Sequence, residues 1–131
     1  MVIFAITAGT LVIGRSTLMP KTLAKGCFHQ VAHKGSGCAG LVRGADGKVF
    51  LELTDFETSD SPDLRVLLSS APDAFENITV QNADQISLGP LTRTGGYQQF
   101  FVPANVSVEQ FHSVTIWNTK YLVNFTTAPL K

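Results

Sequence analysis

The sequence has few charged residues and no excess of either sign. Only 15% of its 131 residues are charged, and ten basic residues balance ten acidic ones. A nucleic-acid surface needs a basic excess to displace counterions, so nucleic acid is not an expected partner. With 44% hydrophobic residues the chain is too apolar for a disordered protein. Its length is about that of one domain, so we expect a single core.

The local motifs of the common enzyme classes are also missing. There is no GxSxG elbow, no HExxH, no phosphate-binding glycine loop and no EF-hand pattern. Asp55 and Asp63 flank the segment 56–62, and paired carboxylates can act as general acid and base. Turn capping is the favoured interpretation, because Asp readily bonds the backbone two residues on. The sequence therefore names no catalytic residue and favours a protein that is not an enzyme.

Histidines are scarce, and their spacing gives only a weak metal signal. His29 and His33 are four residues apart, but on a strand they would be about 13 Å apart. With His112 and one of the cysteines they could in principle bind copper, zinc or haem iron. Scattered histidines are more often surface or turn residues, so we expect no metal site and no cofactor. Haem or copper is the alternative.

Cysteine is limited to Cys27 and Cys38, which are eleven residues apart. This separation fits neither a C-x-x-C redox motif nor a standard zinc site. A turn at residues 34–37 would let segments 27–31 and 38–42 pair as a hairpin, with Phe28, Ala39 and Leu41 on the face opposite both cysteines. We therefore predict a cross-strand disulfide, with free or redox-active thiols as the alternative. Closing this loop would stabilise the fold by about 3 kcal/mol.

The N-terminal run Val2–Gly14 is continuously apolar or small. It is shorter than the roughly 20 residues that span a bilayer, and no basic residue precedes it. Three interpretations are open: an export signal, the remainder of a membrane anchor that begins upstream, or an apolar strand. We favour an export or anchor segment over residues 1–23, with membrane attachment through residues 2–14, and a domain over residues 24–131. The expected location is extracytoplasmic: periplasmic, secreted or membrane-anchored.

The body of the chain lacks any amphipathic stripe of helical length, and short alternating segments take its place. At most, residues 72–77 and 108–111 form single turns. Seven to nine short strands with regular turn signals predict an all-β fold, an antiparallel sandwich or barrel. The expected strands, after the two beside the cysteines, are residues 49–54, 64–69, 78–80, 86–88, 98–102, 113–118 and 121–126.

Trp117 and three asparagines are the remaining candidate positions in these strands and turns. Trp117 lies on the strand face opposite Val114 and Ile116, where packing is favoured over an exposed ligand contact. The sequence pattern for N-glycosylation occurs at Asn77, Asn105 and Asn124, and it matters only in a glycosylating secretory pathway.

The balanced total charge hides two opposite segments. Residues 15–48 contain six basic residues and one acid, whereas residues 52–84 contain eight acids and one base. Such a block could attract a cation or a basic partner. Apolar residues and turn formers separate the acids, so an ordinary solvated face is the favoured interpretation.

Taken in order, several short motifs from residue 26 to residue 130 resemble the DM-thirteen domain, the Skeletor-type family that is also labelled an electron-transfer domain. The motifs are Gly26-x-Phe28, His33, Gly35-Ser36-Gly37, Leu51-x-Leu53-x-Asp55-Phe56-x-Thr58, Pro62-Asp63-Leu64, Leu67-Leu68-Ser69, Ile86-x-Leu88-Gly89-x-Leu91, Gly96-x-Gln98, Pro103, Ser113-Val114-x-Ile116-Trp117 and Val123-x-Phe125-x-x-Ala128-x-Leu130. The resemblance implies an all-β domain of extracytoplasmic or membrane-attached proteins, sometimes beside haem-binding domains.

The family's proposed redox role rests largely on one cysteine that follows the Ile-Trp pair, and here that position is Asn118. An amide cannot cycle between thiol and oxidised sulfur. Ser61 is a second departure, since the family usually has Gly before Pro62-Asp63. Asn118 has the parity of Val114 and Ile116, so it is expected to point inward and to need hydrogen-bond partners.

Two functional hypotheses follow from the resemblance. The leading one is a secreted or membrane-anchored module with a role in protein binding or structure, stapled by Cys27 and Cys38. The rival is an electron-transfer module in which this pair, or a bound metal or haem, exchanges electrons with a membrane-associated redox partner. A hydrolase is a distant third, because no nucleophile and base have a recognisable spacing.

Overall fold

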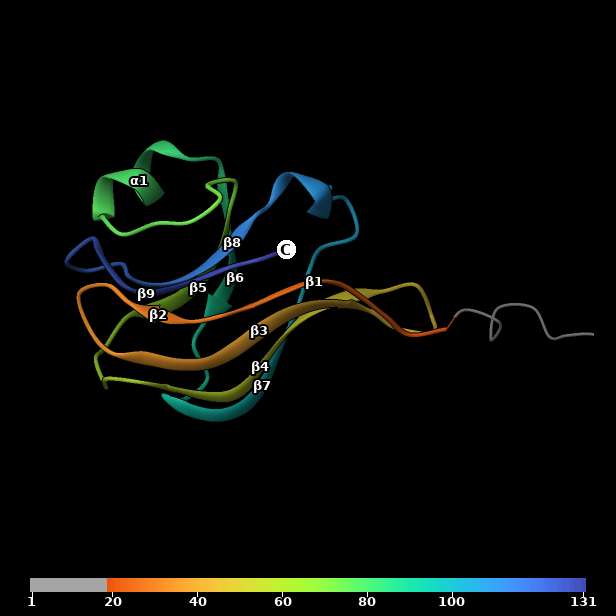
Figure 1. Cartoon of the computed structure of the whole chain (residues 1–131), viewed down its shortest axis with the longest axis horizontal. Coiled ribbons are helices and arrows are strands. Elements are labelled where there is room, and N and C mark those ends of the chain that lie inside the picture. The colour runs from red at the N-terminus through yellow and green to blue at the C-terminus, as the bar shows by residue number, and fades with distance from the viewer. Residues whose placement is uncertain (1–18) are drawn as a thin grey trace, which may run out of the picture.

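The computed structural model describes residues 19–131 as two facing antiparallel sheets (Figure 1). One sheet has the strand order β1-β3-β4-β7 and the other the order β2-β9-β8-β5-β6. The predicted antiparallel sandwich is confirmed, and the barrel alternative is not. The strands are β1 (Lys21–Cys27), β2 (His29–Gln30), β3 (Gly35–Arg43), β4 (Val49–Thr58), β5 (Leu64–Ser69), β6 (Gln85–Pro90), β7 (Gly95–Phe101), β8 (Ser113–Asn118) and β9 (Val123–Pro129).

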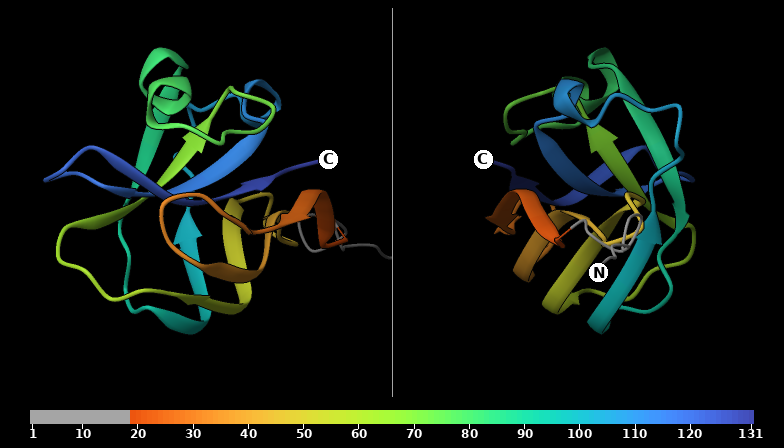
Figure 2. Two further views of the ribbon diagram at one scale, coloured as in Figure 1. Left: turned by 60° about the vertical axis from the view of Figure 1, so that its left-hand side comes forward. Right: turned by 90° about the vertical axis from the view of Figure 1, so that its right-hand side faces the viewer.

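The core lies between the two sheets. It is made by the side chains that point inward at every second position of the strands. Leu51 and Leu53 of β4 are fully buried, while Glu52 and Thr54, which alternate with them, face outward. Phe28, Ala39 and Leu41 are also buried, as the cysteine parity predicts. Two-residue periodicity thus assigns these side chains to the correct face. Figure 2 shows the two layers from the side.

The predicted hairpin of residues 27–31 with 38–42 is wrong in its first strand and in its turn, because residues 35–37 of the predicted turn belong to β3. The pairing runs backward from Cys27↔Cys38 to Lys21↔Arg43, so β1 begins at Lys21, inside the last three residues of the predicted N-terminal segment. After Cys27 the chain crosses the core at Phe28 and joins the other sheet, where His29 pairs with Thr127. Alternation along one strand does not reveal which sheet supplies the partner, so the sequence could not show this crossover.

The predicted strand at residues 78–80 is also wrong. The structure has a short helix there, α1 (Asn77–Asn82), in which Val80 is buried. A three-residue apolar run fits a strand or one helical turn equally well, and only tertiary contacts decide. The predicted single turn near residue 108 is confirmed as the 3₁₀ helix η2 (Val108–Gln110).

Helix α1 and the segment before it cover the outer face of the five-stranded sheet (Figure 2). Leu67 and Trp117 on that face form a second buried cluster with Ala74 and Val80. The predicted packing role of Trp117 is therefore confirmed. Within residues 19–131 no helix is long and apolar enough to cross a membrane. Residues 1–18, which include the predicted apolar segment 2–14, lie outside the described residues.

Candidate functional site

The fold brings about a third of the motif positions to one end of the sandwich, formed by residues 28–35, 55–63 and 117–125. We call this the motif end. It holds the ends of β4 and β8, the start of β9 and the crossover from β1 to β2. At its centre Phe28 and Phe56 pack edge to face, with ring centroids 5.1 Å apart. His33 lies over the ring of Phe125, at 3.9 Å between centroids. Phe28, Phe56 and Phe125 are therefore core residues, and the exposed His33 covers the ring of Phe125.

At Gly35 and Asp55 of the motif end, the backbone limits which residue types fit. A methyl group on Gly35 would collide with the side chain of Thr126 on β9, so only glycine fits there. Asp55 lies in a bulge of β4 and has a φ of 50°. Asp tolerates this left-handed conformation better than most side chains. Asp63 also has a positive φ, of 61°. The backbone conformation thus explains why aspartate occurs at both positions.

Asn118, at the family's cysteine position, is 1% exposed, as its parity predicts. Its Nδ2 donates to Ser61 Oγ at 3.0 Å and to the Pro62 carbonyl at 3.2 Å. Its Oδ1 accepts a hydrogen bond from the Tyr121 backbone N–H at 2.7 Å. Every polar atom of the amide therefore has a partner. Asn118 ties the turn before β5 to the turn after β8, and the two departures from the family pattern contact each other.

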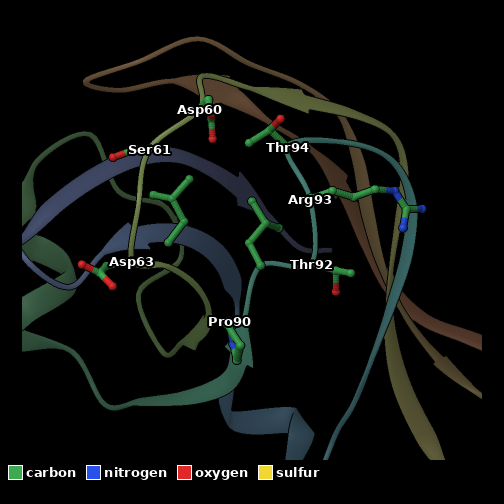
Figure 3. Close-up of a pocket in the computed structure, with 9 residues that line it drawn as sticks. Asp60, Ser61, Asp63, Pro90, Thr92, Arg93 and Thr94 are labelled. Carbon is green, nitrogen blue, oxygen red and sulfur yellow. The ribbon is translucent and has the colours of Figure 1, made fainter.

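Beside this amide lies an open cavity of about 420 Å³ (Figure 3). Asp60, Ser61 and Asp63 line one side, and the residues between β6 and β7 line the other. Arg93 reaches away from the aspartates and donates from Nη2 to the Tyr97 carbonyl. The two carboxylates and the guanidinium therefore do not converge on one point. Sequence analysis assigned no role to the β6–β7 side, where Leu91 alone belongs to a family motif; its members are Pro90, Leu91, Thr92, Arg93 and Thr94.

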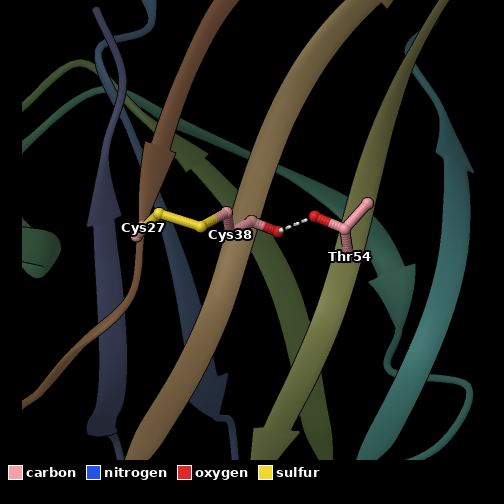
Figure 4. The surroundings of a disulfide bond; sticks show 3 residues. All are labelled: Cys27, Cys38 and Thr54. Atoms are coloured by element: carbon pink, nitrogen blue, oxygen red, sulfur yellow. Dashed lines mark hydrogen bonds between the residues drawn. A yellow bond between two sulfur atoms is a disulfide. The ribbon is translucent and has the colours of Figure 1, made fainter.

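The predicted disulfide between Cys27 and Cys38 is present (Figure 4). It joins β1 to β3 on the outer face of the four-stranded sheet, where Cys27 is exposed and Cys38 is half-buried. The Phe28 N–H donates to the Gly37 carbonyl at 2.9 Å, so the adjacent cysteines form a non-hydrogen-bonded pair. Side chains in such pairs lie closest together, which allows the bridge. Thr54 Oγ1 donates to the Cys38 carbonyl at 3.5 Å.

The three candidate histidines do not converge. His29 Nε2 lies 2.6 Å from Asp73 Oδ1, and its ring stacks on Phe75 with centroids 4.3 Å apart. His33 lies over Phe125, and the His112 backbone N–H donates to the Ser69 carbonyl. Among residues 19–131, no three His, Cys, Asp or Glu side chains are grouped to hold a metal ion. The His29–Asp73 contact joins β2 to the segment that covers the outer face of the same five-stranded sheet.

Tyr97 and Glu52 form a surface network that sequence analysis did not identify. The Tyr97 hydroxyl on β7 donates to Glu52 Oε2 on β4 at 2.6 Å. This hydrogen bond to a carboxylate raises the pKa of Tyr97, and desolvation adds to the shift. Gln99 Nε2 donates to the same hydroxyl at 2.7 Å and works against the shift. The network crosses the sheet face that carries the disulfide, and no sequence motif connects strands so distant along the chain.

The three asparagines with the N-glycosylation pattern differ in their exposure to solvent. Asn124 is fully buried, so its side chain is closed to a glycosylating enzyme in the folded protein. Its Nδ2 has no hydrogen-bond partner. Asn77 is exposed and accepts the Asn124 backbone N–H at Oδ1, whereas Asn105 is exposed in the connection after β7.

Comparison with protein families matches residues 27–130 to the family described as electron transfer DM13. The match covers nearly the whole described structure and includes the disulfide, the motif end and Asn118. Neither the curated proteins nor the solved structures that were searched include a match.

Proposed function

This chain belongs to the electron-transfer DM13 family, and on that premise we propose that it is an extracytoplasmic module with a role in protein binding or structure. In this proposal the Cys27–Cys38 disulfide stabilises the fold. The apolar residues 2–14 attach the chain to a membrane or direct its export. The partner is a protein, and electrons do not pass through the position of the family's cysteine.

The environment of Asn118 is the observation that carries the proposal. The family's redox role is expected to need a sulfur at this position, and the chain has an amide whose three hydrogen bonds join two turns. A buried polar group with all partners satisfied stabilises a fold and leaves no reactive atom free. The position therefore supports a structural role.

The disulfide and the N-terminal sequence support the proposed location. Disulfides persist in oxidising compartments and are rare in the cytosol. A bridge that closes a short loop stabilises a small domain in such a compartment. The apolar run at residues 2–14 has the length of a signal-peptide core. Both features suit a domain that works outside the cytoplasm.

Electron transfer through the disulfide is the second candidate function, and the exposure of Cys27 favours it. An exposed sulfur on an edge strand can be attacked by the thiolate of a partner. The reduced pair would give two electrons to a partner disulfide through a mixed disulfide and would itself return to the oxidised form. A haem or copper bound to this module is the alternative carrier in place of the disulfide.

The reduction potential of the Cys27–Cys38 pair distinguishes the two functions. The full chain is equilibrated in graded glutathione buffers, and the fraction reduced is read by alkylation and intact mass. We expect a potential below about −300 mV, the range of structural disulfides. A value between about −270 and −120 mV, the range of thiol oxidoreductases, would replace the structural role with electron transfer. The Cys27→Ser/Cys38→Ser variant measures background alkylation.

A further inference from the structure

The end of the sandwich opposite the motif end has a pair of facing cations. Lys21 and Arg43 are direct partners across β1 and β3. Like charges directly opposite on a sheet repel each other. The ion pairs within residues 19–131 join His29 to Asp73 and Lys34 to Glu57, so neither cation is neutralised by an acidic partner there. An anion at this place would relieve the repulsion.

The same end presents exposed apolar side chains. Phe101 at the end of β7 is 74% exposed, and Met19 just before β1 is 78% exposed. Phe101 pairs with Phe50, which in turn pairs with Val42, so an apolar row leads across the outer sheet face toward β1. We call the surface formed by residues 19–22, 43–49 and 101–108 the β1 end. Figure 1 shows the start of β1 and the β3–β4 turn lying together there.

Two adjoining cavities open at the β1 end. One, of about 450 Å³, lies between the β3–β4 turn and the connection after β7. The other, of about 570 Å³, reaches the core at Leu41 between the two sheets. They share Gly47, Val49 and Val108. The walls of both cavities are mainly apolar, with Lys48 and Asp46 in the first and Arg43, Lys131 and Glu109 in the second. Apolar clefts beside basic side chains fit amphiphiles that have an anionic head.

Charge separates the two ends of the molecule. Lys48 adds to Lys21 and Arg43 at the β1 end, whose one acid is Asp46, with Glu109 just beyond it. The motif end holds four acids, Asp55, Glu57, Asp60 and Asp63, against the two bases Lys34 and Lys120. The β1 end thus carries a net positive charge and the motif end a net negative charge. An anionic surface would therefore orient the domain so that the β1 end faces that surface.

We infer that the β1 end is a lipid-contacting surface that lies against an anionic bilayer. Lys21, Arg43 and Lys48 contact the headgroup phosphates, and Phe101 and Met19 enter the boundary between headgroups and acyl chains. The inference rests on the proposed attachment through residues 2–14, because that apolar segment joins the domain at this end. Each basic residue near an anionic surface contributes roughly 1 kcal/mol, equivalent to about fivefold in affinity.

Depth-dependent quenching in vesicles tests the orientation. Phe101→Trp and Tyr121→Trp are made in the full chain, because Tyr121 is a matched exposed aromatic at the motif end, 64% exposed. Each variant is bound to vesicles of phosphatidylglycerol and brominated phosphatidylcholine, and the signal of the buried Trp117 is subtracted with the wild type. We expect the emission from position 101 to fall at least about twofold, as for a side chain inserted at the interface, and that from position 121 to stay unchanged.

Each other outcome overturns the inference in a distinguishable way. Vesicle binding without quenching at position 101, or with equal quenching at both positions, leaves membrane attachment standing and removes the oriented contact. No binding to the vesicles removes the attachment as well. An emission change at position 101 that depends on protein concentration without vesicles identifies a second copy of the chain as the occupant.

Arg43→Glu distinguishes a lost lipid contact from misfolding, because the variant is expected to be more stable and yet to bind vesicles more weakly. Replacing one of two facing cations by an acid should raise the melting temperature, because Lys21 gains a cross-strand partner. The same change should weaken binding to anionic vesicles by at least about fivefold. A variant that is more stable and still binds with unchanged affinity contradicts the headgroup contact.

Discussion

At the level of single residues, Ser61 and Asn118 depart from the family pattern together. Ser61 supplies the hydroxyl that accepts a hydrogen bond from Asn118 Nδ2 at 3.0 Å. A glycine at position 61 would leave that donor with the Pro62 carbonyl alone. The amide therefore has a local environment suited to it. Sequence parity predicted that Asn118 is buried, but the two acceptors of its Nδ2 lie 56 and 57 positions earlier in the chain and could not be identified from spacing.

A double-mutant cycle tests this contact. Asn118→Ala should lower the free energy of unfolding by about 1–3 kcal/mol, because the backbone N–H of Tyr121 loses its acceptor. Ser61→Ala should cost less. Denaturant unfolding of both single variants and the double variant should give a coupling energy of about 0.5–3 kcal/mol. Strict additivity would show that the two side chains do not interact in solution.

At the level of elements, α1 depends on the sheet that it covers. Six residues are too few for a helix that is stable alone, and Glu76 at its N-terminal end makes no side-chain capping bond. Val80 instead packs with Trp117 and Leu67 on the outer face of the five-stranded sheet. The sequence predicted a strand at residues 78–80 because the run is apolar. In the structure Val80 is buried and Ile78 is exposed, which fits a helix, because a strand would place both side chains on the same face.

Two substitutions in α1 separate burial from helix propensity. Val80→Ala should destabilise the protein by about 2 kcal/mol and shift the emission of Trp117, the only tryptophan, to longer wavelength. The matched control Ile78→Ala removes a side chain that is 53% exposed and should change stability by less than about 0.5 kcal/mol. Equal effects would mean that α1 is held by its backbone and not by Val80.

At the level of the whole molecule, the disulfide fixes the place where the chain changes sheets. Cys27 ends β1 in one sheet, and within two residues the chain has crossed the core into β2 of the other. The bridge to β3 therefore holds both the edge strand and the crossover in place. Backbone bonds between Lys25 and Lys131, at 3.0 and 3.2 Å, tie the same strand to the end of the chain.

Removal of the bridge should be costly but should not change the fold. Cys27→Ser/Cys38→Ser is expected to lose about 3 kcal/mol of unfolding free energy, because the unfolded chain regains the entropy of an open loop. Chemical denaturation of the variant, compared with the oxidised and reduced wild type, measures the loss. Agreement between the variant and the reduced wild type would assign the effect to the bond. Unchanged stability would contradict the stabilising role of the disulfide.

The sequence alone determined the features that depend on neighbouring residues. Strand periodicity gave the all-β class, the inward faces of β4 and β5, and the parity of Trp117 and Asn118. The hairpin pattern placed Cys27 opposite Cys38, although the connection between them runs through the other sheet. The tertiary structure decided what depends on distant partners, such as the crossover after Cys27, the helix at residues 77–82 and the gathering of motif positions at one end. Pairing between sheets and burial by a covering segment are set by packing over long separations, which no local pattern records.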